Sequence, residues 1–450
     1  MSSLHLREDV ALGRPLDKEF HELAASRSYW LLLLVVGVLV GHAFITSTNI
    51  YAEASGIGGG AAALSQGLSP LEGIVVPTFG AYDLAATLLF PFVAIRLVAS
   101  EKQTGALDFT LQAPTSLATT MLAKGIALLA AWLVAMVAGL LALLVWKAMG
   151  GHLDAGETGN VVLGHVLRGV LAIGISMAAA AVSASAASAA IVALTITVGT
   201  WALEYVAAAR GGAIEALAAY TPEAALRVFE HGELRLATVL VMLALGAAGI
   251  AIAAICLNEG RTMRSRAMRA VAALAVTALV CVAVGRIRTS RDVSEDRRNS
   301  FRRADERALA AIDKPVTVTV YLAAEDPRLV DLERGVLAKL RRTMRNVTVV
   351  YAAKSRSGLF EAGNHYGEIW YEVGGAREMT RSSTEEIVLE TIYRLAGVSP
   401  PTQVEDATYR GYPLRARATA APWIFFGLWP ALVAVMWWLL RGPRSRRVRT

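Results

Sequence analysis

Long apolar stretches separated by short polar ones make up most of this chain. Seven stretches reach the length of a membrane-crossing helix, which needs about 20 mostly apolar residues. They are residues 30–50, 79–99, 121–149, 162–208, 234–257, 267–285 and 423–440. The fourth stretch is too long for one helix, and the small polar run VSASAAS at 182–188 is the expected turn inside it. The pattern therefore predicts about eight transmembrane helices.

Residues 288–415 follow a different pattern, with short helical and β-rich segments in alternation. The β-rich runs PVTVTVYLA and NVTVVYAA flank the helical run DPRLVDLERGVLAKLRRTM, an order typical of a βαβ unit. EIWYEVGGAREMT predicts a hairpin that turns at Gly374–Gly375. We expect Ser300 to cap one helix, Ser383 and Glu386 to form a capping box, and Gly397 to end that second helix. This region predicts a small soluble α/β domain inserted before the last span.

Composition agrees with a membrane protein, because 55% of the residues are hydrophobic and only 18% are charged. Soluble proteins carry about 25% charged residues. The two cysteines, Cys256 and Cys281, both lie in predicted spans and form neither a disulfide framework nor a metal-ligand cluster. We expect no cofactor and no metal. The polar N-terminus does not resemble a cleaved signal, so the first span is expected to be retained.

The formal net charge of +7 would fit a nucleic-acid partner, but the basic residues gather beside spans. Two clusters, at 261–269 and 441–449, are of the kind that marks the cytoplasmic side. Counting crossings from a cytoplasmic N-terminus leaves 51–78 and 150–161, which lack Lys and Arg, outside. We therefore expect no nucleic-acid partner. The predicted location is the bacterial inner membrane, with both termini cytoplasmic and 288–420 extracytoplasmic.

The polar segment RLVASEKQTGALDFTLQAPTS, residues 96–116, lies on the predicted cytoplasmic side between two spans. In a continuous helix, Glu101, Asp108 and Gln112 lie on one side, and Leu107, Leu111 and Pro114 lie on another. Such a helix can lie along the membrane surface and present its polar face to a soluble partner. It can equally be an amphipathic connector that lies on lipid and binds nothing. Pro114 would end it, and Thr115 or Ser116 would cap the next helix.

Three segments resemble parts of ABC-2 type transporter permeases of the gliding-motility and nitrous-oxide-maturation kind. PFVAIRLVASEKQTGALDFTLQAPTS, followed by Lys124, is similar to their cytoplasmic signature. The matching positions are Glu101, Lys102, Gly105, Leu107, Leu111 and Pro114. LDKEFHELAASRSYW resembles the interfacial helix before the first span, and LAAYTPEAALRVFEHGELRLA resembles the outer segment before the sixth.

A second resemblance covers the later part of the chain. DVSEDRRNSFRRADERALAAIDKPVTVTVYL and STEEIVLETIYRLAG are similar to the auxiliary subunit that accompanies gliding-motility-type ABC permeases. In that family the domain lies outside the membrane between two spans, and a longer second portion follows the later helix. Here only residues 398–422 separate that helix from the last span.

The fold class expected from pattern and resemblance is an α-helical polytopic membrane protein, with about eight transmembrane helices and an inserted α/β extracytoplasmic domain. The predicted parts are the interfacial helix (1–29), a six-helix ABC-2 permease domain (30–257), a basic linker with the seventh helix (258–287), the auxiliary domain (288–420), and the last helix with its basic tail (421–450).

The resemblance implies the permease subunit of an ABC transporter, which is not itself an enzyme. The sequence contains no G-x-x-x-x-G-K-[ST] phosphate loop, so a separate ATPase subunit would dock on the cytoplasmic coupling helix. The docking residues implied are Glu101, Lys102, Gly105, Leu107, Asp108, Leu111, Gln112 and Pro114. A second permease copy would complete a dimer in contact with membrane lipid. The alternative is an ATP-driven membrane scaffold of a cell-surface machine that transports nothing. The substrate class stays open among polysaccharide, lipid, peptide and cofactor-maturation cargo.

Four ionisable residues within or near predicted spans are a further set of candidates. Asp83 and Glu204 fall near the outer end of their helices, so we interpret them as solvated at the membrane interface rather than as part of a substrate path. His42 and Arg168 are interpreted in the same way. The small-residue run ISMAAAAVSASAASAA favours close helix packing over a binding site.

Overall fold

The computed structural model describes residues 2–57, 69–104, 116–210, 214, 218, 220–258, 260–323, 326–353, 365–401, 411–414 and 417–440. Eight of the described helices are long and apolar enough to cross a membrane. They are Arg27–Ser55, Leu71–Gln103, Leu117–Ala148, Ala155–Val182, Ala186–Glu204, Leu236–Cys256, Met263–Val284 and Trp423–Leu440. The expected number of spans and the turn between the fourth and fifth are both confirmed.

The chain forms two compact units. The first contains Met1–Gly199, Leu236–Ile287 and Arg410–Thr450, and the second contains Thr200–Arg235 and Arg288–Tyr409. The second unit therefore combines the predicted α/β domain with the segment that precedes the sixth span.

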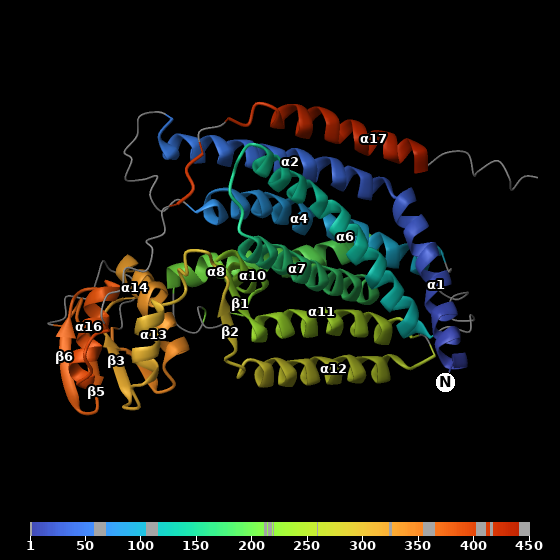
Figure 1. Ribbon diagram of the computed structural model, residues 1–450. Coiled ribbons are helices and arrows are strands. Elements are labelled where there is room, and N and C mark those ends of the chain that lie inside the picture. The colour runs from blue at the N-terminus through green and yellow to red at the C-terminus, as the bar shows by residue number, and fades with distance from the viewer. Residues whose placement is uncertain are drawn as a thin grey trace, which may run out of the picture. The chain divides into compact units, whose positions relative to one another are not determined.

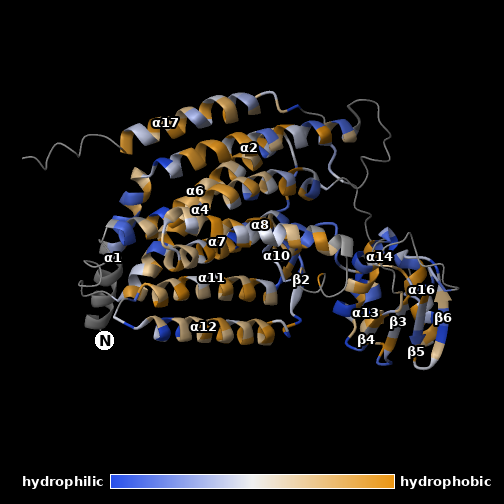
Figure 2. Cartoon of the chain, turned by 180° about the vertical axis from the view of Figure 1, so that it is seen from behind, coloured by the Kyte–Doolittle hydropathy of each residue, from blue (hydrophilic) through white to orange (hydrophobic). Residues whose placement is uncertain are grey.

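The first unit is a bundle of helices that lie side by side (Figure 1). Its elements are α1 (Ser2–Ala25), α2 (Arg27–Ala52) with η1 (Glu53–Ile57), η2 (Leu71–Val75) with α4 (Val76–Thr104), α6 (Leu117–Ala148), α7 (Ala155–Val182), the first part of α8 (Ala186–Arg210), α11 (Leu236–Cys256), α12 (Met263–Val284), and η4 (Trp423–Leu428) with α17 (Trp429–Leu440). Figure 2 shows hydrophobic residues along these helices, as expected where lipid is the solvent.

Aromatic side chains fill the centre of the bundle. The indole of Trp132 packs against the rings of Tyr82 and Phe90, with centroids 5.5 and 5.0 Å away. Edge-to-face pairs of this kind add to the stability that burial supplies. In contrast, α12 contributes no buried residue, so its side chains face outward from the described part of the bundle.

Glycines bring two pairs of helices into close contact. A Cβ atom on Gly174 of α7 would lie 2.4 Å from the carbonyl oxygen of Gly246 in α11. On α2, a Cβ atom on Gly37 would collide with the indole of Trp429, whose Nε1 donates to the Leu33 carbonyl at 2.8 Å. Membrane helices associate through small residues of this kind, because lipid provides no hydrophobic drive between them. The last span is thus attached to the first.

The second unit contains a four-stranded sheet in the order β4–β3–β5–β6. The strands are β3 (Val316–Val320), β4 (Val347–Tyr351), β5 (Ile369–Val373) and β6 (Ala376–Thr380). β3 and β4 are parallel, and the helical segments α14 (Pro327–Leu332), η3 (Glu333–Leu337) and α15 (Ala338–Thr343) connect them, which confirms the βαβ unit. The other pairs are antiparallel.

Local signals in this unit explain the hairpin turn and the end of one helix. Gly374 and Gly375 have φ of 58° and 92°, which is the geometry of a type I′ hairpin turn. Gly397, with φ of 74°, ends α16 (Glu385–Ala396) as expected. The predicted capping box is wrong by one residue, because Thr384 and not Ser383 is the N-cap, and its side chain makes no capping hydrogen bond. The Thr384 amide instead donates to the hydroxyl of Ser382.

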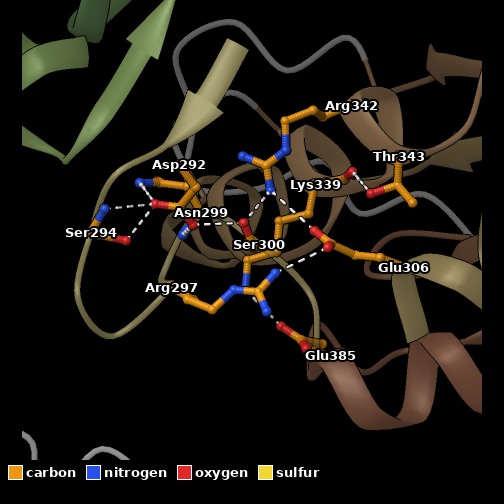
Figure 3. A network of polar contacts seen from close by, with 10 residues as sticks. All are labelled: Asp292, Ser294, Arg297, Asn299, Ser300, Glu306, Lys339, Arg342, Thr343 and Glu385. Carbon is orange, nitrogen blue, oxygen red and sulfur yellow. Dashed lines mark hydrogen bonds and ion pairs between the residues drawn. The ribbon is translucent and has the colours of Figure 1, made fainter. Parts of the chain in front are cut away.

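Ser300 does not cap a helix either. Helix α13 (Arg303–Ala310) begins after Arg302, and the Ser300 hydroxyl donates to Asp292 at 2.7 Å. Asp292 also accepts from the backbone amides of Ser294 and Asn299, at 3.0 and 3.1 Å. Figure 3 shows these side chains converging on one carboxylate. The hydroxyl is therefore already used by a tertiary contact.

This network ties the α/β fold to the segment before the sixth span. Strand β1 (Glu233–Arg235) follows α10 (Pro222–Glu230) and pairs antiparallel with β2 (Ser290–Asp292), and the Asn299 side-chain amide donates to the His231 carbonyl at 2.7 Å. Gly232, with φ of 76°, allows the close approach, since a Cβ atom there would lie 2.8 Å from the Ser294 Cβ atom. The α/β fold therefore contacts this segment directly, through strand pairing and a side-chain hydrogen bond.

Asp292→Ala is expected to loosen this junction. It removes the acceptor of five hydrogen bonds, which come from Ser294, Asn299 and Ser300. The change should cost about 1–3 kcal/mol, because partly buried donors are left unsatisfied. Asp296→Ala is the matched control, since Asp296 lies in the same loop but its ion pair with Arg298 is local and partly exposed, of a kind worth about 0–1 kcal/mol. Amide hydrogen exchange over residues 231–235 and 290–300 measures the difference. Equal exchange in the two variants would contradict a role for Asp292 in the junction.

Candidate functional site

Helix α1 lies across one end of the bundle, against α2, α4, α6 and α17 (Figure 1). The chain turns from α1 into α2 at Ser26, whose backbone is extended and whose amide donates to the Leu23 carbonyl at 3.0 Å. The Trp30 indole donates to the Ala24 carbonyl at 2.7 Å and holds this turn closed. A helix therefore precedes the first span, and its position at the membrane interface stays a prediction.

Four charged side chains meet where α1 crosses α4 and α6. The Lys124 ammonium lies 2.8 Å from both carboxylate oxygens of Glu19 and 3.1 Å from Oε1 of Glu101. It also donates to the Leu97 carbonyl at 3.2 Å. Lys18 contacts Glu101 from the more exposed side. We call Lys18, Glu19, Glu101 and Lys124 the charge cluster.

Burial makes this cluster energetically important. The Lys124 side chain is 0% exposed, and those of Glu19 and Glu101 are 1% and 4% exposed. Burial raises the pKa of Glu19, and the charge of Lys124 opposes that rise. Burial alone would lower the pKa of Lys18, but its hydrogen bond to Glu101 and the charge of that carboxylate raise it overall. Charges this deep are tolerated only when they are paired.

Lys102, the next residue of the predicted docking segment, is bonded to another helix. Its ammonium donates to the carbonyls of Ala181 and Ser183, at 3.1 and 2.8 Å, at the C-terminal end of α7. A cation is favourable there because unpaired carbonyls carry partial negative charge. Glu101 and Lys102 together connect the end of α4 to α1, α6 and α7.

The other predicted docking residues lie outside the described residues: Gly105, Leu107, Asp108, Leu111, Gln112 and Pro114. Where the description resumes, Ser116 caps α6 by accepting from the Thr119 amide at 3.1 Å, which confirms one of the two expected caps. Among the described residues, no group of three or more His, Cys, Asp or Glu could hold a metal ion.

Residues 16–288 match the family model described as ABC-2 family transporter protein. That range is more than half of the chain. The protein belongs to the ABC-2 transporter family. No curated protein matches the chain, and no solved structure does.

Family membership makes this protein a multi-pass membrane component of transport, the permease subunit of an ABC transporter. The matched range includes α1 from residue 16 onward, the charge cluster and seven of the eight described spans, up to α12. The α/β fold and the last span lie beyond it.

The interpretation of Asp83 and Arg168 as solvated at the interface is wrong for this ABC-2 protein. Asp83 is 4% exposed, and its Oδ1 lies 3.4 Å from Nε of Arg168 on α7, while Thr87 contacts both side chains. Arg168 is itself 1% exposed. The two charged side chains lie on facing helices and pair with each other, so neither is an unpaired charge among the spans.

Two other ionisable residues show different environments. His165 is fully buried between the rings of Phe79 and Tyr82, and neither ring nitrogen has a hydrogen-bond partner among the described residues. Glu204 forms an ion pair at 2.7 Å with Arg227, which lies on α10 between the fifth and sixth spans. That cation is therefore neutralised locally.

The role of Lys124 was not predicted from the sequence, and Glu19 was not among the candidate residues. The available signal was an ammonium inside an apolar stretch that otherwise qualifies as a span. A charge at such a position requires a partner, and α1 offered several carboxylates. Which of them lies within reach was decided by the packing of α1.

Proposed function

We propose that a separate nucleotide-binding subunit drives this ABC-2 permease by docking on residues 97–114. The observation that carries the proposal is the attachment of Glu101 and Lys102 to three other helices. A segment anchored in this way passes a displacement to those helices as rigid-body motion instead of absorbing it by bending. The missing phosphate loop supports a separate source of ATP hydrolysis.

The residues of this segment have different parts in the proposal. Glu101 is buried in the charge cluster, so we assign it the role of anchoring the segment to α1 and α6. Asp108 and Gln112 would form the polar docking face. Gly105 would permit close approach, Leu107 and Leu111 would face the permease, and Pro114 would end the segment.

The proposed assembly contains two permease copies and two ATPase subunits in the bacterial inner membrane. The termini and the charge cluster would lie in the cytoplasm, and residues 288–420 outside it. The basic residues 261–269 at the start of α12 support this orientation. Single cysteines at Ser265 and Ser355, introduced after Cys256 and Cys281 are replaced by Ala, test it with impermeant thiol reagents. Labelling of Ser355→Cys from the cytoplasmic side would contradict the orientation.

We further propose that the α/β fold is an auxiliary domain like those of gliding-motility-type permeases, fused here to the permease in the domain order expected from the sequence. Its βαβ sheet and its bonds to the segment 231–235 support this assignment. The same bonds favour the second candidate function, an ATP-driven scaffold that moves a surface structure. ATP turnover of the reconstituted complex that responds to a cargo molecule would favour transport over the scaffold.

The docking proposal predicts that Asp108→Lys with Gln112→Lys reduces co-purification of the ATPase subunit about tenfold or more. Asp108→Lys reverses a charge and Gln112→Lys adds a positive one, so both would repel a cationic partner surface, and close charge pairs across interfaces are worth about 1.5–7 kcal/mol. Asp17→Lys is the matched control, because Asp17 is exposed on α1 and lies outside the docking segment. Full recovery of the ATPase with the double variant would disprove docking at this face. A native complex without any ATPase would disprove the proposed function as a whole.

A further inference from the structure

A cavity of about 230 Å³ lies between the turn from α1 to α2 and the last turns of α4. One part of its lining is polar and comes from Glu22, Ser26 and Arg96. The other part is apolar and comes from Leu23, Val93 and Leu97. Because the cavity adjoins membrane-spanning helices, a molecule with a polar head and an apolar body fits this division.

Ser26 has an unused hydrogen-bonding group in this cavity. It is the N-cap of α2, a helix of 26 residues, but its side chain makes no capping bond. The residue is 7% exposed, and its hydroxyl has no hydrogen-bond partner among the described residues. Buried hydroxyls are normally paired. The first amides of α2 also lack intrahelical acceptors and carry partial positive charge, so the position suits an anion.

Arg96 supplies a full positive charge at the same place. Its side chain is exposed, and no described residue forms an ion pair with it. A guanidinium binds phosphate oxygens in a bidentate arrangement, which is why arginine is common in phosphate sites. Ser26, the first amides of α2 and Arg96 thus bring hydrogen-bond donors and a positive charge to the lining of one cavity.

Glu22 narrows the choice of ligand. Its carboxylate lies 3.5 Å from Lys18, which is half exposed, and it also lines the cavity. A purely anionic head group would be repelled by this carboxylate. A head group that carries an ammonium beside its phosphate would instead pair with Glu22 while its phosphate binds Arg96.

We propose that this cavity binds the head group of an aminophospholipid of the phosphatidylethanolamine type. Its phosphate lies between Ser26, the α2 N-terminus and Arg96, and its primary ammonium donates to Glu22. The acyl chains follow the outer face of α4, where Leu88 and Phe92 are exposed. The bound lipid would then sit five residues before Glu101, next to the segment proposed to receive the ATPase.

Native mass spectrometry of the full chain tests the site, with phosphatidylethanolamine, phosphatidylcholine or phosphatidylglycerol added to delipidated protein. We expect phosphatidylethanolamine to bind about tenfold more tightly than either other lipid, since a hydrogen bond to a charged group is worth about that factor. Choline cannot donate to Glu22, and the glycerol head group lacks a cation.

Variants separate this site from general lipid contact. Arg96→Gln should weaken phosphatidylethanolamine binding about tenfold, whereas Arg264→Gln on the exposed start of α12 should leave it unchanged. Glu22→Gln should remove the preference over phosphatidylglycerol while the protein still binds lipid. Equal binding of all three lipids, or equal effects of the two arginine variants, would mean non-specific annular lipid only and would overturn the proposal.

Discussion

Lys124→Met is expected to destabilise the helix bundle by about 3–5 kcal/mol, the usual cost of removing one partner from a buried ion pair. The variant leaves Glu19 without a cation, although its side chain is 1% exposed. Lys18 stays beside Glu101 but does not replace both contacts of Lys124. Thermal unfolding in detergent, followed by tryptophan fluorescence, measures the effect, and a large loss of monodisperse protein should accompany it.

Lys147→Met is the matched control, because Lys147 lies near the other end of α6 and is exposed. It should leave the melting temperature almost unchanged. The double variant Glu19→Met with Lys124→Met should recover much of the lost stability, since apolar side chains of similar volume often replace a buried ion pair without cost. A double variant no more stable than Lys124→Met would show that the lysine acts through packing and not through its charge.

Gly174→Ala is expected to force α7 away from α11 and to cost about 1–3 kcal/mol or more, the range of overpacking substitutions. The new methyl group would lie 2.4 Å from the Gly246 carbonyl oxygen, a backbone atom that cannot rotate away. Gly249, which lies on α11 together with Gly246, approaches the Gly174 backbone equally closely. The same unfolding measurement detects the change.

Gly159→Ala makes the same chemical change in the same helix, where no atom lies within 4 Å of the added methyl group. Because alanine favours a helix over glycine by about 0.8–1.0 kcal/mol, this control should be neutral or slightly stabilising. If both variants behaved alike, contact between α7 and α11 would not depend on the small residues at their crossing.

The candidate site was only partly predictable from the sequence. The resemblance drew attention to Glu101 and Lys102, and both lie where α4 meets other helices. Their partners could not be inferred, because Lys124 and Glu19 are 105 positions apart and Lys102 binds backbone carbonyls that any residue could supply. The docking role of Asp108 and Gln112 stays a prediction.

The sequence alone determined the features that depend on local properties. The eight spans follow from the length of the apolar runs, because a bilayer has a definite thickness. The hairpin at Gly374–Gly375 and the end of α16 at Gly397 follow from glycine's access to positive φ. Only the tertiary structure decided which side chains meet. Asp83 was predicted to be solvated near a helix end, but it pairs with Arg168 on α7. Ser300 was predicted to cap a helix, but its hydroxyl donates to Asp292. These hydrogen-bond and ion-pair partners are separated in the chain, so they come within reach of each other only once the chain has folded.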